Sequence, residues 1–235
     1  MKTIGILGGM SWESTLLYYR VINEGVRERL GGLHSASILL DSGDFAAMET
    51  LQAAGEWALI GRILTEKALK LQDAGAEGLL IATNSMHELA DLVAGAIDVP
   101  FLHIADAVGE ALIEDGIQMV GLLGTRFTME RPFYTGRLRE RFGIEARIPE
   151  SEDRERVHRV IYQELCRGII DDSSRTAYLR IMDELVEEGA RAIVLGCTEI
   201  GLLVGEDDTQ IPLYDTARLH AEAAVRWMLE DSRDL

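Results

Sequence analysis

Residues 73–85 read DAGAEGLLIATNS, and residues 187–199 read EEGARAIVLGCTE. Each stretch starts at the acidic end of a helical pattern, passes through a glycine into a short apolar run and ends in polar residues. A glycine at this point stops a helix, and a short apolar run bounded by such signals indicates a buried strand. Each stretch therefore predicts a helix end, a buried strand and a polar loop at the carboxyl end of that strand.

The two stretches belong to an internal repeat that covers most of the chain. GILGG at residues 5–9 corresponds to GLLGT at residues 121–125, and VPFL at residues 99–102 corresponds to IPLY at residues 211–214. The offset between corresponding residues stays between 112 and 116. A repeat of this length indicates two similar halves.

Short β-branched runs alternate with longer helical patterns in both halves, which is typical of βαβ units and a parallel sheet. We expect, for example, a strand at residues 36–40 and one helix over residues 129–142, with Pro132 in its first turn. The sequence therefore predicts an α/β fold in which two parallel-sheet halves are related by a pseudo-twofold axis. Small ligands bind at the carboxyl ends of parallel strands, so we expect the active site in the cleft between the halves.

The repeat also predicts the limits of the halves. We place the first α/β half at residues 1–112 and the second at residues 113–212. A C-terminal helix within residues 213–235 is expected to pack back on the first half.

Composition and charge exclude several classes of protein. The chain has 235 residues and a formal net charge of −17, which disfavours binding to nucleic acid or to an anionic membrane. It contains no apolar run near the ~20 residues that a bilayer span requires and no signal-peptide pattern. Two cysteines, Cys166 and Cys197, are too few for a disulfide framework. We therefore expect a cytoplasmic protein whose partner is a small molecule, with no nucleic acid and no membrane.

The polar loops of the repeat contain the candidate catalytic residues. Thr83 and Cys197 occupy equivalent positions, 114 residues apart. Under a pseudo-twofold axis they would face a shared ligand from opposite sides. This arrangement suits inversion at a tetrahedral carbon, because one group removes a proton and the other delivers one to the opposite face.

These motifs resemble those of the aspartate/glutamate racemase superfamily. The similar stretches are LGGM at residues 7–10 with Ser11 to Thr15, TNSMH at residues 83–87, LGT at residues 123–125 with Thr128 and Met129, and GCTE at residues 196–199. The resemblance covers nearly the whole chain in the same order. It implies an amino-acid racemase that acts on aspartate or glutamate with two opposed cysteines, without pyridoxal phosphate or another cofactor and without metal, and usually as a homodimer.

The chain departs from the family pattern at its first catalytic position, where Thr83 replaces a cysteine. The resemblance implies that Cys197, which matches the second cysteine, deprotonates the L-isomer. A thiol with a pKa near ~8.5 can be tuned to a thiolate at neutral pH, whereas a threonine hydroxyl without a partner base cannot become a comparable base. We therefore expect L-isomers to react through Cys197 and D-isomers to be poor substrates, with Thr83 donating or relaying a proton.

The same resemblance implies a set of substrate-binding residues. Those expected to hold the carboxylate and ammonium groups are Asn84, Ser85, Thr125 and Thr198. Met10 and Ser11 would line the pocket, and Arg126 or Ser11 would bind a distal carboxylate. Glu199 either orients the thiol or is a first-turn carboxylate favoured by the helix dipole.

Other chemistry has weaker support. The remaining histidines, apart from His87, show no metal-ligand spacing, and His87 either poises a neighbour or is a satisfied helix-end side chain. Residues 5–9 lack the G-x-G-x-x-G spacing of a dinucleotide site. Two alternatives stay open: a decarboxylase of the same superfamily that needs one cysteine, and an amino-acid-binding protein without turnover.

Overall fold

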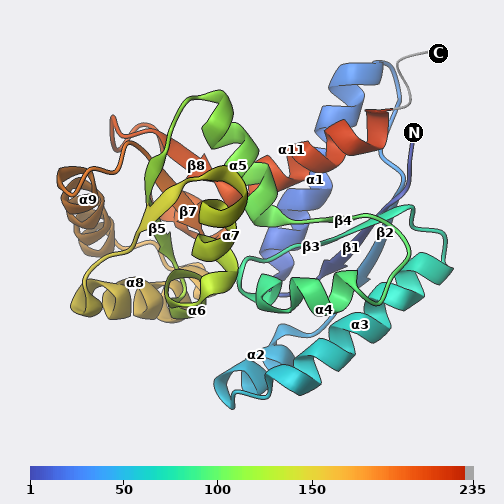
Figure 1. Cartoon of the computed structure of the whole chain (residues 1–235), viewed down its shortest axis with the longest axis horizontal. Coiled ribbons are helices and arrows are strands. Elements are labelled where there is room, and N and C mark those ends of the chain that lie inside the picture. Colours follow the sequence, from blue (N-terminus) through green and yellow to red (C-terminus); the bar gives the residue numbers. More distant parts are fainter. Residues whose placement is uncertain (231–235) are drawn as a thin grey trace. The chain divides into compact units, whose positions relative to one another are not determined.

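The computed structural model describes residues 1–230 of the chain. Within this part the chain forms two four-stranded parallel sheets flanked by helices (Figure 1). The strand order is β2-β1-β3-β4 in the first sheet and β6-β5-β7-β8 in the second. The predicted α/β class with two parallel-sheet halves is confirmed.

The two sheets contain corresponding strands. The first sheet consists of β1 (Ile4–Gly8), β2 (Ile38–Ser42), β3 (Gly78–Ile81) and β4 (Phe101–Leu102). The second consists of β5 (Met119–Gly124), β6 (Glu145–Arg147), β7 (Ile193–Gly196) and β8 (Leu213–Asp215). The identical order of the strands is the structural counterpart of the sequence repeat.

Helices connect the strands in each sheet. In the first half they are α1 (Trp12–Leu30), α2 (Phe45–Ala53), α3 (Trp57–Asp73), the 3₁₀ turn η1 (Ser85–Leu89) and α4 (Ala90–Ala94). After β4 they are α5 (Ile104–Glu114), α6 (Arg126–Glu130), α7 (Pro132–Phe142), α8 (Ser151–Gln163), the 3₁₀ turn η2 (Leu165–Arg167), α9 (Asp172–Glu187), α10 (Ile200–Leu203) and α11 (Thr216–Leu229).

The stretches at residues 73–85 and 187–199 end their helices in the same way. Gly75 follows α3 with φ of 101°, and Gly189 follows α9 with φ of 103°. A left-handed residue after a helix turns the chain, and glycine adopts it without a Cβ clash. Both turns feed directly into the buried strands β3 and β7.

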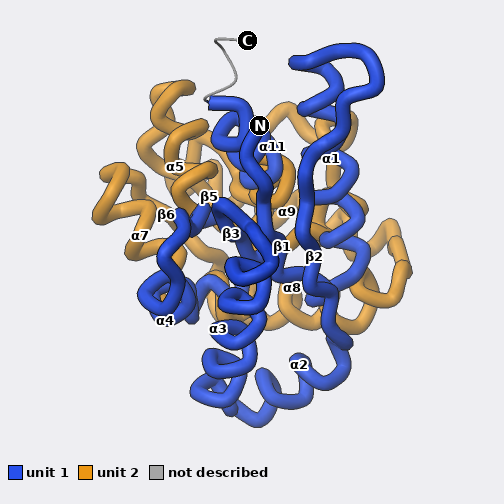
Figure 2. The backbone as a smooth tube through the Cα atoms, turned by 90° about the vertical axis from the view of Figure 1, so that its right-hand side faces the viewer, with its two compact units in different colours: residues 1–104, 220–235 blue, residues 105–219 orange. Residues whose placement is uncertain are grey.

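The chain divides into two compact units, which Figure 2 shows in different colours. One unit contains residues 1–104 and the chain from His220 onward, and the other contains residues 105–219. The predicted limits of the halves are residues 112 and 212, whereas the chain passes between the units after residues 104 and 219. The first predicted limit lies inside α5, and the second lies just before β8. Residues 231–235 of the predicted C-terminal helix lie outside the described residues.

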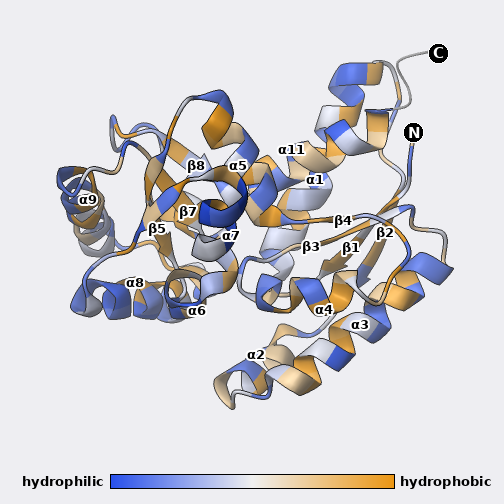
Figure 3. Cartoon of the chain, in the orientation of Figure 1, coloured by the Kyte–Doolittle hydropathy of each residue, from blue (hydrophilic) through white to orange (hydrophobic). Residues whose placement is uncertain are grey.

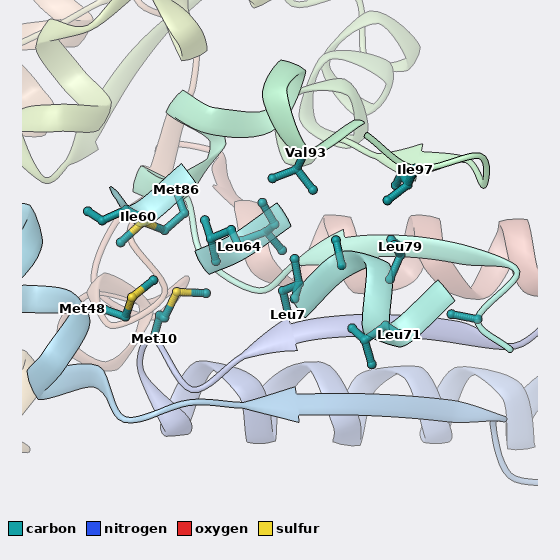
Figure 4. Close-up of a cluster of buried hydrophobic side chains, with 13 residues drawn as sticks. Leu7, Met10, Met48, Ile60, Leu64, Leu71, Leu79, Met86, Val93 and Ile97 are labelled. Atoms are coloured by element: carbon teal, nitrogen blue, oxygen red, sulfur yellow. The ribbon is translucent and has the colours of Figure 1, made fainter. Parts of the chain in front are cut away.

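Each unit has its own apolar core. In the first unit a buried cluster forms between the sheet and its helices, and Figure 4 shows Leu7, Leu64 and Leu79 within it. In the second unit β5 and β7 are buried almost throughout. Figure 3 shows the hydrophobic end of the colour scale along β1 and β5, whereas α8 is mostly hydrophilic.

Two predicted elements need correction. The single helix expected over residues 129–142 is wrong, since α6 and α7 are separate helices that meet at Arg131. Arg131 has φ of −93° and ψ of 146°, because a following proline disfavours the helical conformation at the preceding residue. The strand expected at residues 36–40 begins two residues later, at Ile38.

None of the helices within residues 1–230 is both long enough and apolar enough to cross a membrane.

Candidate active site

The loop after β7 brings a thiol and a carboxylate together. Cys197 Sγ donates a hydrogen bond to Glu199 Oε2 at 2.9 Å, and Thr198 Oγ1 donates to the same oxygen at 2.7 Å. Glu199 is buried, with 7% of its surface exposed, whereas Cys197 is half-buried. The three neighbouring residues therefore form one hydrogen-bonded group around a single carboxylate oxygen.

This environment favours the neutral thiol in the protein without a ligand. Burial raises the pKa of Cys197 well above its ordinary value, and the negative charge of Glu199 raises it further. Both effects penalise a thiolate, because burial removes water and the carboxylate repels a second negative charge. The hydrogen bond from Sγ to Glu199 requires this proton on the sulfur.

Tyr178 of α9 is a neighbour of the thiol that the sequence does not reveal. Burial raises the pKa of Tyr178 well above its ordinary value, and the next largest cause is the charge of Cys197. Its hydroxyl donates to the carbonyl oxygen of Val157 at 3.0 Å. The spacing of the apolar residues in α9 indicates only that Tyr178 is a core residue. Only the tertiary structure shows that it lies close to Cys197.

In the first unit, the loop after β3 is fixed by His87. His87 Nδ1 lies 2.8 Å from the carbonyl oxygen of Thr83, and Ile104 N–H donates to His87 Nε2 at 3.2 Å. A carbonyl only accepts and an amide N–H only donates, so Nδ1 carries the proton and Nε2 does not. His87 is therefore a neutral imidazole in one tautomer, and it joins Thr83 to the start of α5.

Further buried rings surround His87. The ring centroids of His87 and His103 lie 4.6 Å apart, and those of His87 and His220 lie 5.7 Å apart. His220 Nε2 donates to the carbonyl oxygen of Leu102 at 3.0 Å, so the hydroxyl of Tyr18 donates to the unprotonated Nδ1 at 2.8 Å. These rings pack against His87, which binds the Thr83 carbonyl. Thr83 itself is half-buried, while Asn84 and Ser85 are buried.

The loops after the first strand of each sheet end in equivalent helix caps. Ser11 Oγ accepts a hydrogen bond from Ser14 N–H at 3.3 Å, and Thr125 Oγ1 accepts one from Thr128 N–H at 3.4 Å. In each pair the two hydroxyls also lie within hydrogen-bond distance of each other. These side chains satisfy the free amides at the starts of α1 and α6. The offset between the two caps is 114 residues, as for Thr83 and Cys197.

The first of these loops is hydrogen-bonded to α1 and passes close to Gly43. Gly9 N–H donates to Thr15 Oγ1 at 2.8 Å, and Gly9 has φ of 82°. A Cβ on Gly9 would lie 2.3 Å from the carbonyl oxygen of Gly43. Met10, predicted to line the substrate pocket, is buried in the apolar core, where Figure 4 shows it beside Met48.

Arg126 forms an exposed ion pair with Glu155 of α8. Its Nη1 lies 3.6 Å from Glu155 Oε2, and it lines an open cavity of about 500 Å³ between α6 and α8. The other residues lining this cavity are Glu130, Ser151, Glu152, Glu155, Arg156 and Arg159. The backbone N–H of Arg126 donates to His158 Nδ1 at 3.3 Å, and the pKa of His158 is lowered by burial and then by the charge of Arg126. The cavity is lined by positively and negatively charged side chains in equal number, and Cys197 is not among its lining residues.

Comparisons with known proteins give a consistent result. The family pattern described as Asp/Glu/Hydantoin racemase matches residues 7–224. The broad specificity amino-acid racemase RacX of Bacillus subtilis is 19% identical over 171 residues, which is 70% of each chain.

Solved structures include nearer relatives. A crystal structure from Yersinia pestis, assigned as an Asp/Glu racemase, is 50% identical with a TM-score of 0.92, over 97% of this chain and 100% of that chain. An aspartate racemase homologue from Pyrococcus horikoshii OT3 is 34% identical with a TM-score of 0.84, over 97% and 99% of the two chains. The likeness in both cases extends over the two halves of the chain.

Proposed function

Because the chain belongs to the Asp/Glu/hydantoin racemase family, we propose that it inverts aspartate or glutamate by moving the α-proton, reacting most readily with the L-isomer. Family membership makes the protein an isomerase. The choice of an acidic amino acid follows the family and its relatives. We propose that neither pyridoxal phosphate nor a metal takes part.

The observation that carries this proposal is the hydrogen bond from the Cys197 thiol to the Glu199 carboxylate. Cys197 can act as a base only after it loses its proton, and Glu199 Oε2 lies 2.9 Å away to accept it. The transfer leaves a thiolate beside a neutral carboxylic acid. Glu199 then donates to the sulfur instead of repelling it, so the transfer removes the charge that raises the thiol pKa.

The proposed reaction then proceeds in two proton transfers. The Cys197 thiolate removes the α-proton of the L-isomer and becomes a thiol again. The resulting carbanion receives a proton on its opposite face from Thr83, directly or through water. Water restores the Thr83 hydroxyl, and the hydroxide that this leaves takes up the proton held by Glu199, so that the thiol and the carboxylate are both regenerated. The position of Thr83 opposite Cys197 rests on the sequence repeat, in which the two residues correspond.

Polar side chains near these groups would bind the substrate. We propose that hydroxyl and amide groups hold its α-carboxylate and ammonium, namely those of Asn84, Ser85, Thr125 and Thr198. Preorganised donors of this kind stabilise charge that develops in a transition state. Arg126 and Ser11 are the candidates for the distal carboxylate, and binding by Arg126 requires its guanidinium to leave the exposed contact with Glu155.

The preference for the L-isomer can be measured in α-proton exchange but not in kcat/KM for inversion, for a thermodynamic reason. The equilibrium constant of a racemisation is one, so kcat/KM for complete inversion is equal in both directions. Exchange of the α-proton with solvent is not constrained in this way. Cys197 can remove and return a proton on one face many times before Thr83 reacts once.

The test follows α-proton exchange in deuterated water by NMR, with L- and D-aspartate and L- and D-glutamate supplied separately. We expect the L-isomer to exchange faster than it inverts, the D-isomer to exchange no faster than it inverts, and a Cys197→Ser variant to do neither. Equal exchange of both enantiomers contradicts the asymmetric roles. Absence of any exchange by the folded protein overturns the racemase proposal, and release of carbon dioxide from a substituted malonate would then indicate the decarboxylase.

A further inference from the structure

Helix α8 holds Arg126, a candidate for binding the distal carboxylate of the substrate, in two separate ways. Figure 1 shows α6 beside α8, and the two helices pack against each other within the second unit. Arg126 is the first residue of α6, and it contacts α8 through both its backbone and its side chain. The backbone contact and the side-chain contact can therefore have different roles.

The backbone of Arg126 is fixed by a histidine. Its N–H donates to His158 Nδ1 at 3.3 Å. This amide belongs to the first turn of α6 and has no acceptor within the helix. His158 therefore satisfies it from the neighbouring helix, as the Thr125 hydroxyl satisfies the amide of Thr128. A ring nitrogen that accepts a hydrogen bond carries no proton, so His158 is neutral in this contact.

The imidazole of His158 is held in place by rings on both helices. Its centroid lies 6.3 Å from that of Phe127 on α6 and 4.9 Å from that of Tyr162 on α8. Burial lowers the pKa of His158, and the charge of Arg126 lowers it further, whereas two nearby glutamates raise it. The net direction favours the neutral ring, so Nδ1 stays an acceptor at neutral pH.

The guanidinium of Arg126 is held more loosely than its backbone. Nη1 lies 3.6 Å from Glu155 Oε2, and the two side chains are 49% and 57% exposed. Ion pairs this exposed add little stability, so another carboxylate can displace Glu155 without moving the backbone of Arg126. A fixed backbone is thus combined with a side chain whose partner can be exchanged.

The open cavity between α6 and α8 has room for that second carboxylate. Its volume of about 500 Å³ is within the range of small-ligand sites, and both Arg126 and Glu155 line it. Arg156, also in the lining, has a buried Nε that makes no hydrogen bond in the described part of the chain, and its pairing with Asp153 Oδ1 is long, at 3.9 Å. An acceptor bound in the cavity would satisfy this donor.

Building on the proposed racemase function, we propose that α8 positions Arg126 for the distal carboxylate of a dicarboxylic amino acid. His158 fixes the backbone of Arg126, and Glu155 occupies the guanidinium until the substrate carboxylate displaces it. Thr125, the residue before Arg126, is a proposed ligand of the α-carboxylate or ammonium, so adjacent residues bind the two ends of one substrate. His158 and Glu155 are positioning residues, since neither takes part in the proton transfers.

Calorimetric titration of L-aspartate and L-asparagine into Cys197→Ser tests the role of His158, because it measures binding without turnover. Added to this variant, His158→Leu should raise the dissociation constant of L-aspartate about 3- to 10-fold and that of L-asparagine less. His158→Asn supplies an acceptor in place of Nδ1 and should restore the binding of L-aspartate. Equal weakening of both ligands, no difference between the two substitutions, or no binding of L-aspartate overturns the proposal.

Glu155→Gln tests the displacement. Removing the competing carboxylate should lower the dissociation constant of L-aspartate about 2- to 5-fold. Glu152→Gln is the matched control and should have a smaller effect, since Glu152 lines the same cavity but is not the partner of Arg126. Equal effects of the two substitutions would mean that only the total charge of the cavity matters, and would overturn the role of Glu155.

NMR titration of the histidine ring protons gives a readout that needs no substrate. Arg126→Gln removes a positive charge that lowers the pKa of His158, while Glu155 and Glu130 still raise it. His158 should therefore titrate at higher pH than in the wild type, and an unchanged titration contradicts the contact on which the positioning role rests. Thermal unfolding by circular dichroism establishes that each variant is folded.

The two proposals fail in different ways. Binding of L-aspartate with the expected effects of the variants, but no α-proton exchange by the wild type, would overturn the racemase proposal and support the role of α8.

Discussion

The proton between Cys197 and Glu199 can reside on either group, and the surroundings decide which. Burial penalises a negative charge on Cys197, and the present hydrogen bond leaves the proton on sulfur. A substrate ammonium near the pair would lower the energy of the thiolate. The binding of the substrate therefore activates the proposed base, and the thiol stays protonated in the empty site.

Glu199→Gln separates two effects of this carboxylate, which raises the pKa of the Cys197 thiol and accepts its proton. The substitution removes a negative charge that raises the thiol pKa, so Cys197 should titrate at lower pH than in the wild type, while burial still keeps it raised. Turnover should nevertheless fall by about 10²–10⁴, because the proton acceptor is lost. Alkylation rates measured against pH report the thiolate, and Glu187→Gln, on the exposed end of α9, is the control. An unchanged alkylation profile contradicts the electrostatic coupling.

Thr83→Cys should change the balance between the two faces. A thiol at this position can serve as a base, so exchange of the α-proton of the D-isomer should rise by about 10² or more. Thr83→Ser keeps a hydroxyl and should leave the ratio of L to D exchange near that of the wild type. The measurement is initial-rate exchange in deuterated water for each enantiomer. If Thr83→Cys exchanges D-isomers no faster than Thr83→Ser, the residue does not face the α-carbon.

The tautomer of His87 leads to a prediction about a positioning residue. Asparagine can replace the donor at Nδ1, which binds the Thr83 carbonyl, whereas glutamine can replace the acceptor at Nε2, which binds Ile104 N–H. We expect His87→Gln to lower inversion more than L-isomer exchange, because only inversion needs Thr83 in place. His87→Asn should keep the ratio of the two rates closer to that of the wild type. An equal loss of both rates in both variants would indicate a structural role alone.

At the scale of elements, the two halves use the same local devices with one difference. Ser11 and Thr125 cap the helices that follow β1 and β5, at an offset of 114 residues, yet Leu7 and Leu123 on the strands are 116 residues apart. The first loop is therefore two residues longer. The extra length is accommodated by Gly9, which passes close to Gly43.

Gly9→Ala should destabilise the first unit more than the same substitution at a glycine of similar conformation that has open space around its Cα. The positive φ costs about 1–2 kcal/mol for alanine, and the clash with the Gly43 carbonyl adds about 1–3 kcal/mol. Gly55→Ala is the matched control, since Gly55 has φ of 74° and no other atom within 4 Å of a Cβ. Urea unfolding of both variants measures the difference. Equal free energies of unfolding would show that the loop moves freely away from Gly43.

At the scale of the whole molecule, the net charge of −17 should oppose binding of an acidic substrate. Added salt screens this repulsion, since the Debye length falls from ~30 Å at 0.01 M to ~10 Å at 0.1 M ionic strength. We therefore expect kcat/KM for L-aspartate to rise with salt over this range. Initial rates in sodium chloride check it, with L-asparagine as a neutral comparison that should change less. A fall in kcat/KM for L-aspartate would indicate that local cations dominate the field at the site.

The sequence by itself determined the architecture, because the signals involved are local and occur twice. Helix-ending glycines, short apolar runs and the polar loops at residues 83–85 and 197–199 predicted two parallel sheets with a repeated order, and the structure has them. The family could also be named from these loops. The separation of α6 from α7 was missed, although Pro132 is a local signal for it, because the helical periodicity on both sides was read as one element.

The tertiary structure decided which side chains meet, both between near neighbours and between residues distant in the sequence. Glu199 was an open choice between thiol partner and helix-end carboxylate until its oxygen was found 2.9 Å from Cys197 Sγ. His87 takes one tautomer only because Ile104, seventeen residues away, donates to it. Met10 precedes the polar Ser11 in the sequence, but its side chain lies beside Met48 in the apolar core. Rotamers, tautomers and burial depend on packing across the sheet, and periodicity along a single chain does not contain that information.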